Sequence, residues 1–288
     1  MGVSGPHNAD ASLKFIKWND IYKTEKPFQI FANLPDDATD KRLSNLDWED
    51  KSKVVADLRG SESDYSLDAN GFQVVQHKSA IDDFRDRELI ERDYLPEVEE
   101  LLRQRLDGVD KIFIFDWRLR KSRTGIDDTY DLNDPMKILP PAEGVHIDQS
   151  SIAVIGRIER QLPDEARELL RSRRIRVVNV WRPINHPVED MPLAVCDGST
   201  VESHDLVETD HVRSSYIGST MYLLDNERHR WHYVSRQKVD EVLMFKNFDS
   251  DRDVAASFAP HGAFKVDDLQ EEWKPRESIE VRALIFTK

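Results

Sequence analysis

From residue 111 onward, the sequence carries a series of short runs rich in β-branched and aromatic residues, and this pattern limits the possible folds most strongly. Each run is bounded by Pro, Gly, Asp or Asn, which is typical of strands separated by turns. The predicted strands are residues 111–117, 151–158, 175–184, 220–225, 241–248 and 278–287. Helices do not alternate regularly with these runs, so a parallel sheet is disfavoured. The pattern predicts a mainly β protein, either a β-sandwich or a double-sheet jelly roll with flanking helices.

Two segments show helical rather than strand periodicity. Residues 89–106 carry apolar side chains at helical spacing, with Pro96 in the first turn. Residues 163–174 begin with Pro163 and end with basic residues, which suits the helix dipole. We therefore expect a single domain over residues 1–288, in which a helical and irregular region (1–110) packs on a jelly-roll core (111–288).

Composition excludes several classes of function. The 288 residues include 41 Lys and Arg against 55 Asp and Glu, a net charge of −14, which disfavours a nucleic-acid partner. Cys196 is the single cysteine, so the sequence has neither a disulfide framework nor a multi-cysteine zinc site. No apolar run approaches the roughly 20 residues that span a bilayer. These features predict a cytoplasmic protein that acts on a small molecule.

The most informative local feature is His146-Ile147-Asp148. Side chains two apart on a strand point to the same face, so His146 and Asp148 would project together. One imidazole and one carboxylate form two-thirds of the 2-His-1-carboxylate triad that binds Fe(II) and leaves coordination positions open. The tripeptide is common by chance, however, and by itself also fits a half-exposed strand without function.

The C-terminal part of the chain supplies the remaining groups that this chemistry needs. His261 follows a predicted strand, and Arg276 and Ser278 open the next one. A third iron ligand would have to come from a distant strand, as His261 does. A guanidinium with a hydroxyl beside it would hold the far carboxylate of a dicarboxylate cosubstrate through paired hydrogen bonds. His229 and His232 are the alternatives for the third ligand.

With these residues, the sequence resembles the fungal gibberellin-desaturase-like hydroxylase/desaturase family of Fe(II)/2-oxoglutarate-dependent oxygenases, which is related to the small chain of the bacterial cephamycin methoxylase. The resemblance extends from about residue 112 to the C-terminus. It is carried by the segments NVWRP (179–183), PLAVCD (192–197), FKNFDSD (245–251), APH (259–261) and RESIEVRALIF (276–286).

The resemblance implies a double-stranded β-helix (jelly-roll) core in which His146, Asp148 and His261 are the catalytic iron ligands. It also implies that Arg276 and Ser278 bind 2-oxoglutarate, that O2 is the second cosubstrate, and that the enzyme hydroxylates, desaturates or cyclises a secondary metabolite. Arg276 lies 15 residues after His261, a longer gap than in many such enzymes. Arg282, on the same face of the same strand, is the alternative clamp, and Ser278 favours Arg276.

Further side chains are candidates for contact with the substrate: Arg118, Trp181, Arg182 and Tyr222. Together with Arg282, the two arginines among them suggest a substrate that bears a carboxylate. Two other functions fit the same residues, namely an iron oxygenase that does not use 2-oxoglutarate and a non-catalytic jelly-roll binding protein. The sequence also leaves open a homodimer formed through the N-terminal region.

Overall fold

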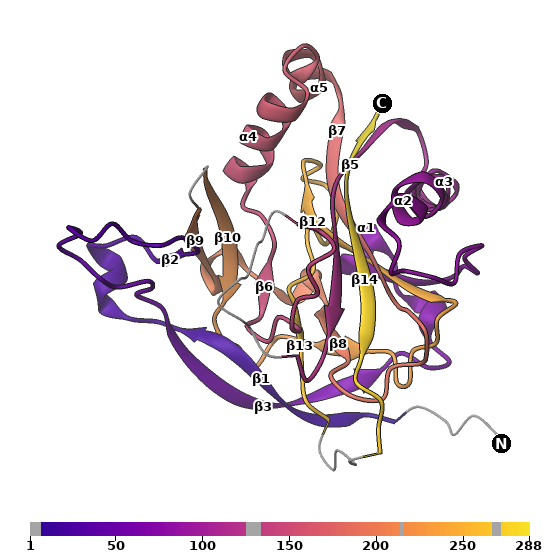
Figure 1. The fold of residues 1–288 in the computed structure, drawn as a ribbon, viewed down its shortest axis with the longest axis horizontal. Helices are drawn as coiled ribbons and strands as arrows, with labels where there is room; N and C mark the ends of the chain where they lie inside the picture. The colour runs from indigo at the N-terminus through magenta and orange to yellow at the C-terminus, as the bar shows by residue number, and fades with distance from the viewer. Residues whose placement is uncertain (1–6, 125–133, 214–215, 267–271) are drawn as a thin grey trace.

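The computed structural model describes residues 7–124, 134–213, 216–266 and 272–288, and its strands form two sheets (Figure 1). The larger sheet contains, in spatial order, β1 (Ala9–Lys17), β3 (Asp47–Asp57), β11 (Trp231–Tyr233), β8 (Leu193–Cys196), β13 (His261–Ala263), β6 (His146–Ile147), β10 (Ile217–Leu223), β9 (Leu206–Val212) and β2 (Phe28–Ile30). The smaller sheet contains β4 (Phe72–Gln76), β12 (Glu241–Asp249), β7 (Arg174–Pro183), β14 (Glu277–Thr287) and β5 (Val109–Lys121).

The chain passes repeatedly from one sheet to the other. Strands β5, β6, β7 and β8 belong alternately to the smaller and the larger sheet, and so do β12, β13 and β14. This winding is the double-stranded β-helix, or jelly roll, that the sequence predicts. It places β6 and β13 next to each other, although more than a hundred residues separate them in the sequence.

The two faces of the smaller sheet differ in character. Its outer face is apolar and packs against α3 (Leu95–Arg105), where Val180 and Val281 contact the same cluster as Val98 and Leu102. Its inner face carries polar and charged side chains from β5, β7 and β14, because the alternation of each strand directs every second residue inward. The outer face therefore stabilises the sheet, while the inner face is available for a polar site.

The predicted helix over residues 89–106 is confirmed. It consists of α2 (Arg87–Leu89), a π-helical turn (Ile90–Tyr94) and α3, which follow one another without a break. The predicted helix over residues 163–174 is present as α5 (Ala166–Ser172). Apart from α4, described below, the other helical segments are short: α1 (Leu67–Asn70) and 3-10 turns at Asp20–Lys23, Glu62–Asp64, Gly198–Thr200 and Ser203–Asp205.

The predicted strand over residues 151–158 is wrong, because this segment begins α4 (Ser151–Gln161). The Ser150 side chain caps the helix by accepting a hydrogen bond from the backbone N–H of Ala153. Val154 and Ile158, one turn apart, are buried against β7 and β14, whereas Ile152 is 72% exposed. A short apolar run fits a strand and a helix equally well by composition, and here the cap decides.

The first 110 residues contain more strand than the sequence predicts. Strand β1 pairs over its whole length with β3, and the two extend the larger sheet beside β11, while β4 adds an edge to the smaller sheet beside β12. Ala11, Leu13 and Phe15 alternate with exposed or half-buried residues and are buried, which is the period of a strand with one buried face. No helix in the described part of the chain is long and apolar enough to cross a membrane.

Candidate metal centre and active site

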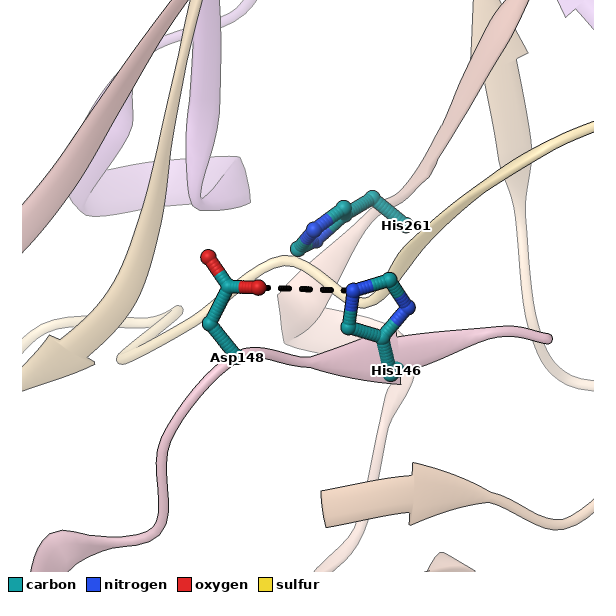
Figure 2. Close-up of side chains that lie close together, drawn as sticks. All are labelled: His146, Asp148 and His261. Carbon is teal, nitrogen blue, oxygen red and sulfur yellow. Dashed lines mark ion pairs between the residues drawn. The ribbon is translucent and has the colours of Figure 1, made fainter. Parts of the chain in front are cut away.

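The jelly roll brings the three predicted iron ligands together. His146 lies on β6, Asp148 follows that strand directly, and His261 begins β13, where it is the cross-strand partner of His146. The imidazole centroids lie 4.5 Å apart, and the ligand atoms of all three residues lie within 4.8 Å of one another. Figure 2 shows the three side chains converging on one point. Two imidazoles and one carboxylate in this arrangement match the donor set of a non-haem Fe(II) site.

Backbone carbonyls orient both imidazoles in the same way. Nδ1 of His146 lies 2.8 Å from the carbonyl oxygen of Gly144, and Nδ1 of His261 lies 3.1 Å from that of Ala259. Each Nδ1–H donates to its carbonyl, so each Nε2 keeps its lone pair for a metal. Burial, together with the charge of His146, lowers the pKa of His261 to about 3, so His261 remains a neutral ligand at physiological pH.

Asp148 is oriented by two neighbours on the smaller sheet. Its Oδ2 accepts hydrogen bonds from Nδ2 of Asn179 at 2.7 Å and from Nε of Arg282 at 2.8 Å. Its Oδ1 lies 3.4 Å from Nε2 of His146. Burial alone would raise the pKa of Asp148, but the charge of Arg282 together with the neighbouring His146 and His261 outweighs it and holds the pKa well below its usual value. The carboxylate is therefore ionised and directed before any metal binds.

Arg282 is fully engaged in this network. Besides Asp148, its guanidinium donates to Asp116 at 2.9 Å and to Glu280 at 2.8 Å. A guanidinium that faces three carboxylates cannot also hold the carboxylate of 2-oxoglutarate without losing one of them. The structure therefore assigns the alternative clamp, Arg282, to the support of Asp148.

Arg276 has the opposite environment. It is 1% exposed, it donates to the carbonyl oxygen of Met191 at 2.5 Å, and its Nε has no hydrogen-bond partner in the described residues. The Oγ of Ser278, also buried, is likewise without a described partner. Burial and the nearby charge of Arg120 lower the pKa of Arg276. An anion beside these two residues would accept hydrogen bonds from the unpaired polar atoms and would neutralise the buried charge of Arg276.

A narrow cavity lies beside the metal ligands on the inner face of the smaller sheet. His146 and His261 line it, and so do Trp181 and Glu280, the cross-strand pair that lies between Arg276 and the triad on the inner face of the sheet. The guanidinium of Arg276 lies 5.6 Å from the centre of the Trp181 ring. Trp181 therefore borders both the cavity beside the metal ligands and the guanidinium of Arg276.

Comparisons with known proteins agree with this geometry. A family model described as "Oxidoreductase/YMDC permease-like domain" matches residues 13–286. The hydroxylase/desaturase CTB9 of Cercospora beticola is 33% identical over 85% of this chain and 79% of its own length. The Fe(II)/2-oxoglutarate-dependent dioxygenase nvfI of Aspergillus novofumigatus is 33% identical over 84% of this chain and 86% of its own length. The chain belongs to this fungal family of Fe(II)/2-oxoglutarate-dependent oxygenases.

A solved structure supports the family at the level of the fold. The iron and alpha-ketoglutarate-dependent endoperoxidase NvfI superposes on this oxygenase with a TM-score of 0.83 and 28% identity, over 97% of this chain and 98% of that one. The similarity therefore includes the N-terminal strands, for which sequence reasoning found the weakest pattern.

The structure separates the predicted substrate residues of the oxygenase. Trp181 lines the cavity, and Arg118 lies on the same inner face, where it pairs with Asp116 at 3.1 Å. Tyr222 is the cross-strand partner of His146. Arg182, in contrast, lies on the outer face against Tyr94, because it neighbours Trp181 on the same strand. Arg182 therefore lies on the other side of the sheet from the cavity.

The alternative third ligands also lie elsewhere. His229 pairs with Asp205 at 3.1 Å, and His232 packs against the rings of Tyr65 and Phe72. Neither belongs to the cluster formed by His146, Asp148 and His261.

Sequence reasoning missed several residues of the site. Asn179 is a fully buried amide inside strand β7. A polar residue within an otherwise apolar stretch of sequence was the signal that could have identified it. Asn247 accepts a hydrogen bond from the backbone N–H of Asp148 at 2.8 Å. His211 lies on β9, and its Nε2 is 3.2 Å from the hydroxyl of Tyr222. Contacts of this kind depend on strand register.

Proposed function

We propose that this protein is an Fe(II)/2-oxoglutarate-dependent oxygenase that attacks an unactivated C–H bond of a small molecule in fungal secondary metabolism. The observation that carries the proposal is the combination of the His146, Asp148 and His261 cluster with the buried Arg276, whose Nε has no described partner and whose guanidinium lies against Trp181, a residue of the cavity beside the cluster. Relatives named as hydroxylase/desaturases and 2-oxoglutarate-dependent dioxygenases support the reaction class.

The donor set fits the metal and the cosubstrate. His146 and His261 would bind Fe(II) through Nε2, and Asp148 through Oδ1, the carboxylate oxygen that faces Nε2 of His146. Bound iron with 2-oxoglutarate and O2 supplies the oxidising power that removes hydrogen from the substrate. Arg276 and Ser278 would hold the distal carboxylate of 2-oxoglutarate. Trp181 would keep water away from the carbon atoms between the two carboxylates of 2-oxoglutarate.

The surroundings of His146 support an apolar substrate rather than a carboxylate-bearing one. Arg118 and Arg282 are paired with carboxylates, and Arg182 lies on the outer face, so the basis for expecting an acidic substrate is lost. Next to His146, Tyr222 packs edge-on against Trp48 at a centroid distance of 4.8 Å. An aromatic wall of this kind suits a flat or polycyclic apolar skeleton.

Turnover without added substrate tests the proposal. We expect the purified protein, supplied with Fe(II), 2-oxoglutarate and O2, to form succinate slowly in equal amount to the 2-oxoglutarate consumed. The variants H146A and D148A should lose this reaction, while H204A, a change in an exposed histidine far from the cluster, should retain it. Oxygen consumption that needs iron but not 2-oxoglutarate would identify the cosubstrate-independent oxygenase instead. No iron-dependent reaction at all would contradict the proposal.

A further inference from the structure

A second cavity lies on the opposite side of the strand that carries the metal ligands. On β6 and β10, the pair His146 and Tyr222 faces the metal side, whereas the neighbouring pair Ile147 and Met221 faces away from it. Ile147 and Met221 both line a cavity of about 270 Å³. Its other lining residues come from the start of α4, from β9 and from the end of β12 with the loop after it: Gln149, Ser150, Ser151, Ile152, Leu206, Glu208, Asn247, Phe248 and Phe258.

Two buried polar groups in this cavity have no described partner. Asn247 is 2% exposed, and its Nδ2 makes no hydrogen bond to any described residue. The orientation of this amide is fixed, because its Oδ1 accepts the hydrogen bond from the backbone N–H of Asp148. Gln149 is 8% exposed, and its Oε1 also lacks a partner in the described part of the chain. The cavity therefore presents one unused donor and one unused acceptor.

The rest of the lining determines the charge and character of a ligand. Ile147, Met221 and Phe248 are apolar, so most of the ligand surface must be apolar as well. The carboxylate of Glu208 lines the same cavity and disfavours an anion. The first turn of α4 contributes Ser151 and Ile152, and the positive end of the helix dipole favours a carbonyl oxygen nearby.

We propose that this cavity is a second binding site, for a small neutral molecule that combines an apolar body with a carboxamide or lactam group. The ligand carbonyl accepts a hydrogen bond from Nδ2 of Asn247, and the ligand N–H donates to Oε1 of Gln149. Because Asn247 also holds the backbone of Asp148, occupation of this site restrains the metal-binding carboxylate from behind. The site itself requires neither iron nor 2-oxoglutarate.

Two matched probes test the ligand chemistry on the full, metal-free chain. We expect 4-phenylbutyramide to bind in ligand-observed NMR titrations with half-saturation below about 1 mM, well within the weak range of small-ligand affinities. The anion 4-phenylbutyrate, of the same size and shape, should bind at least about tenfold more weakly, because it lacks the N–H donor and faces Glu208. Equal binding of the two probes would overturn the proposal, and so would the absence of amide binding.

Three variants locate the binding site. M221W fills the cavity and should abolish amide binding, and Q149L removes the acceptor and should weaken amide binding about tenfold without filling the cavity. H146A should bind the amide as the unchanged protein does, because His146 lies on the other face. Thermal unfolding measures whether each variant is folded. If M221W does not fold, Q149L still tests whether the amide binds in this cavity. Loss of binding in H146A, or full binding in Q149L, would overturn the proposal.

Discussion

Single residues around the metal centre act through hydrogen bonds that fix the ligands before metal arrives. Two backbone carbonyls set the tautomers of His146 and His261, and Asn179 and Arg282 set the position of the Asp148 carboxylate. Partners of this kind raise metal affinity because less freedom is lost when the metal binds. Asn179 bridges two carboxylates, since the same Nδ2 also donates to Glu280 at 2.7 Å.

Removing this amide should weaken metal binding without removing a ligand. In N179L, Asp148 loses one of its two side-chain donors on the smaller sheet, and we expect the affinity for Fe(II) or Co(II) to fall about 10–100-fold. Competition with a coloured chelator under anaerobic conditions measures this affinity. N70L is the matched control, because Asn70 makes a comparable hydrogen bond to Asp197, which is not part of the cluster. An unchanged metal affinity in N179L would contradict the positioning role.

The ligand triad could be predicted from the sequence because residue types and short spacings are enough to indicate a metal site of this kind. His146 and Asp148 are two apart, and His261, Arg276 and Ser278 occur together near the C-terminus. Asn179 and Asn247 could not be predicted in the same way, because their contacts with Asp148 depend on which strands pair and in what register. The choice between Arg276 and Arg282 likewise required the positions of Asp116 and Glu280.

At the scale of elements, strand β14 carries Arg282, which supports Asp148, and the proposed clamp Arg276 directly precedes the strand. Its start is anchored by the turn before β8, where the buried Asp190 accepts hydrogen bonds from the backbone N–H of Arg276 at 2.6 Å and from Oγ of Ser122 at 2.7 Å. The carbonyl of the next residue, Met191, accepts from the Arg276 guanidinium. The turn therefore fixes both the backbone and the side chain of Arg276.

Loosening this anchor should affect 2-oxoglutarate and spare the metal. In D190N, one acceptor oxygen becomes a donor facing other donors, so we expect the start of β14 to shift and the Kd for 2-oxoglutarate to rise about tenfold or more. Affinity for Fe(II) should remain within about twofold, because the triad lies on other strands. Anaerobic equilibrium dialysis measures both. E189Q, at the neighbouring residue that binds Lys274, should change neither. A parallel loss of metal affinity would argue against the separation of the two roles.

The strands of the core could be predicted, while α4 and β1–β3 could not be predicted with the same rules. The core strands are rich in β-branched residues and lie between clear turns. Residues 151–158 have the composition of a strand, and the capping hydrogen bond of Ser150 makes them a helix. Strand β3 carries charged side chains on its exposed face, which hid its alternation until its pairing with β1 was known.

At the scale of the whole molecule, buried histidines couple stability to pH. Burial, with the charges of His146 and Arg213, lowers the pKa of His211 to about 4, and His261 is lowered to about 3. The unfolded chain binds protons at these residues below about pH 6.5, whereas the folded metal-free protein does not, so stability is full above pH 6.5 and is lost as the pH falls toward 4.

The variant H211Q should reduce this loss. Each buried histidine contributes about 1.4 kcal/mol per pH unit between its unfolded and folded pKa, and the variant lacks one such contribution. Urea unfolding of the metal-free protein at pH 7, 6 and 5 gives the slope of the unfolding free energy against pH. Acidic side chains contribute equally to this slope in the unchanged protein and in H211Q. Parallel pH profiles of the two proteins would show that His211 titrates normally in the folded state.

The central claim has two parts: the triad binds iron, and Arg276 binds the far carboxylate of 2-oxoglutarate. The most direct test is an anaerobic absorption titration of the Fe(II)-loaded protein with 2-oxoglutarate, which follows the weak visible band of a keto acid chelated to iron. We predict a saturating band that is absent in H146A and that needs much more 2-oxoglutarate for half-saturation in R276M. A band with unchanged half-saturation in R276M, or no band in the iron-loaded protein, would contradict the account.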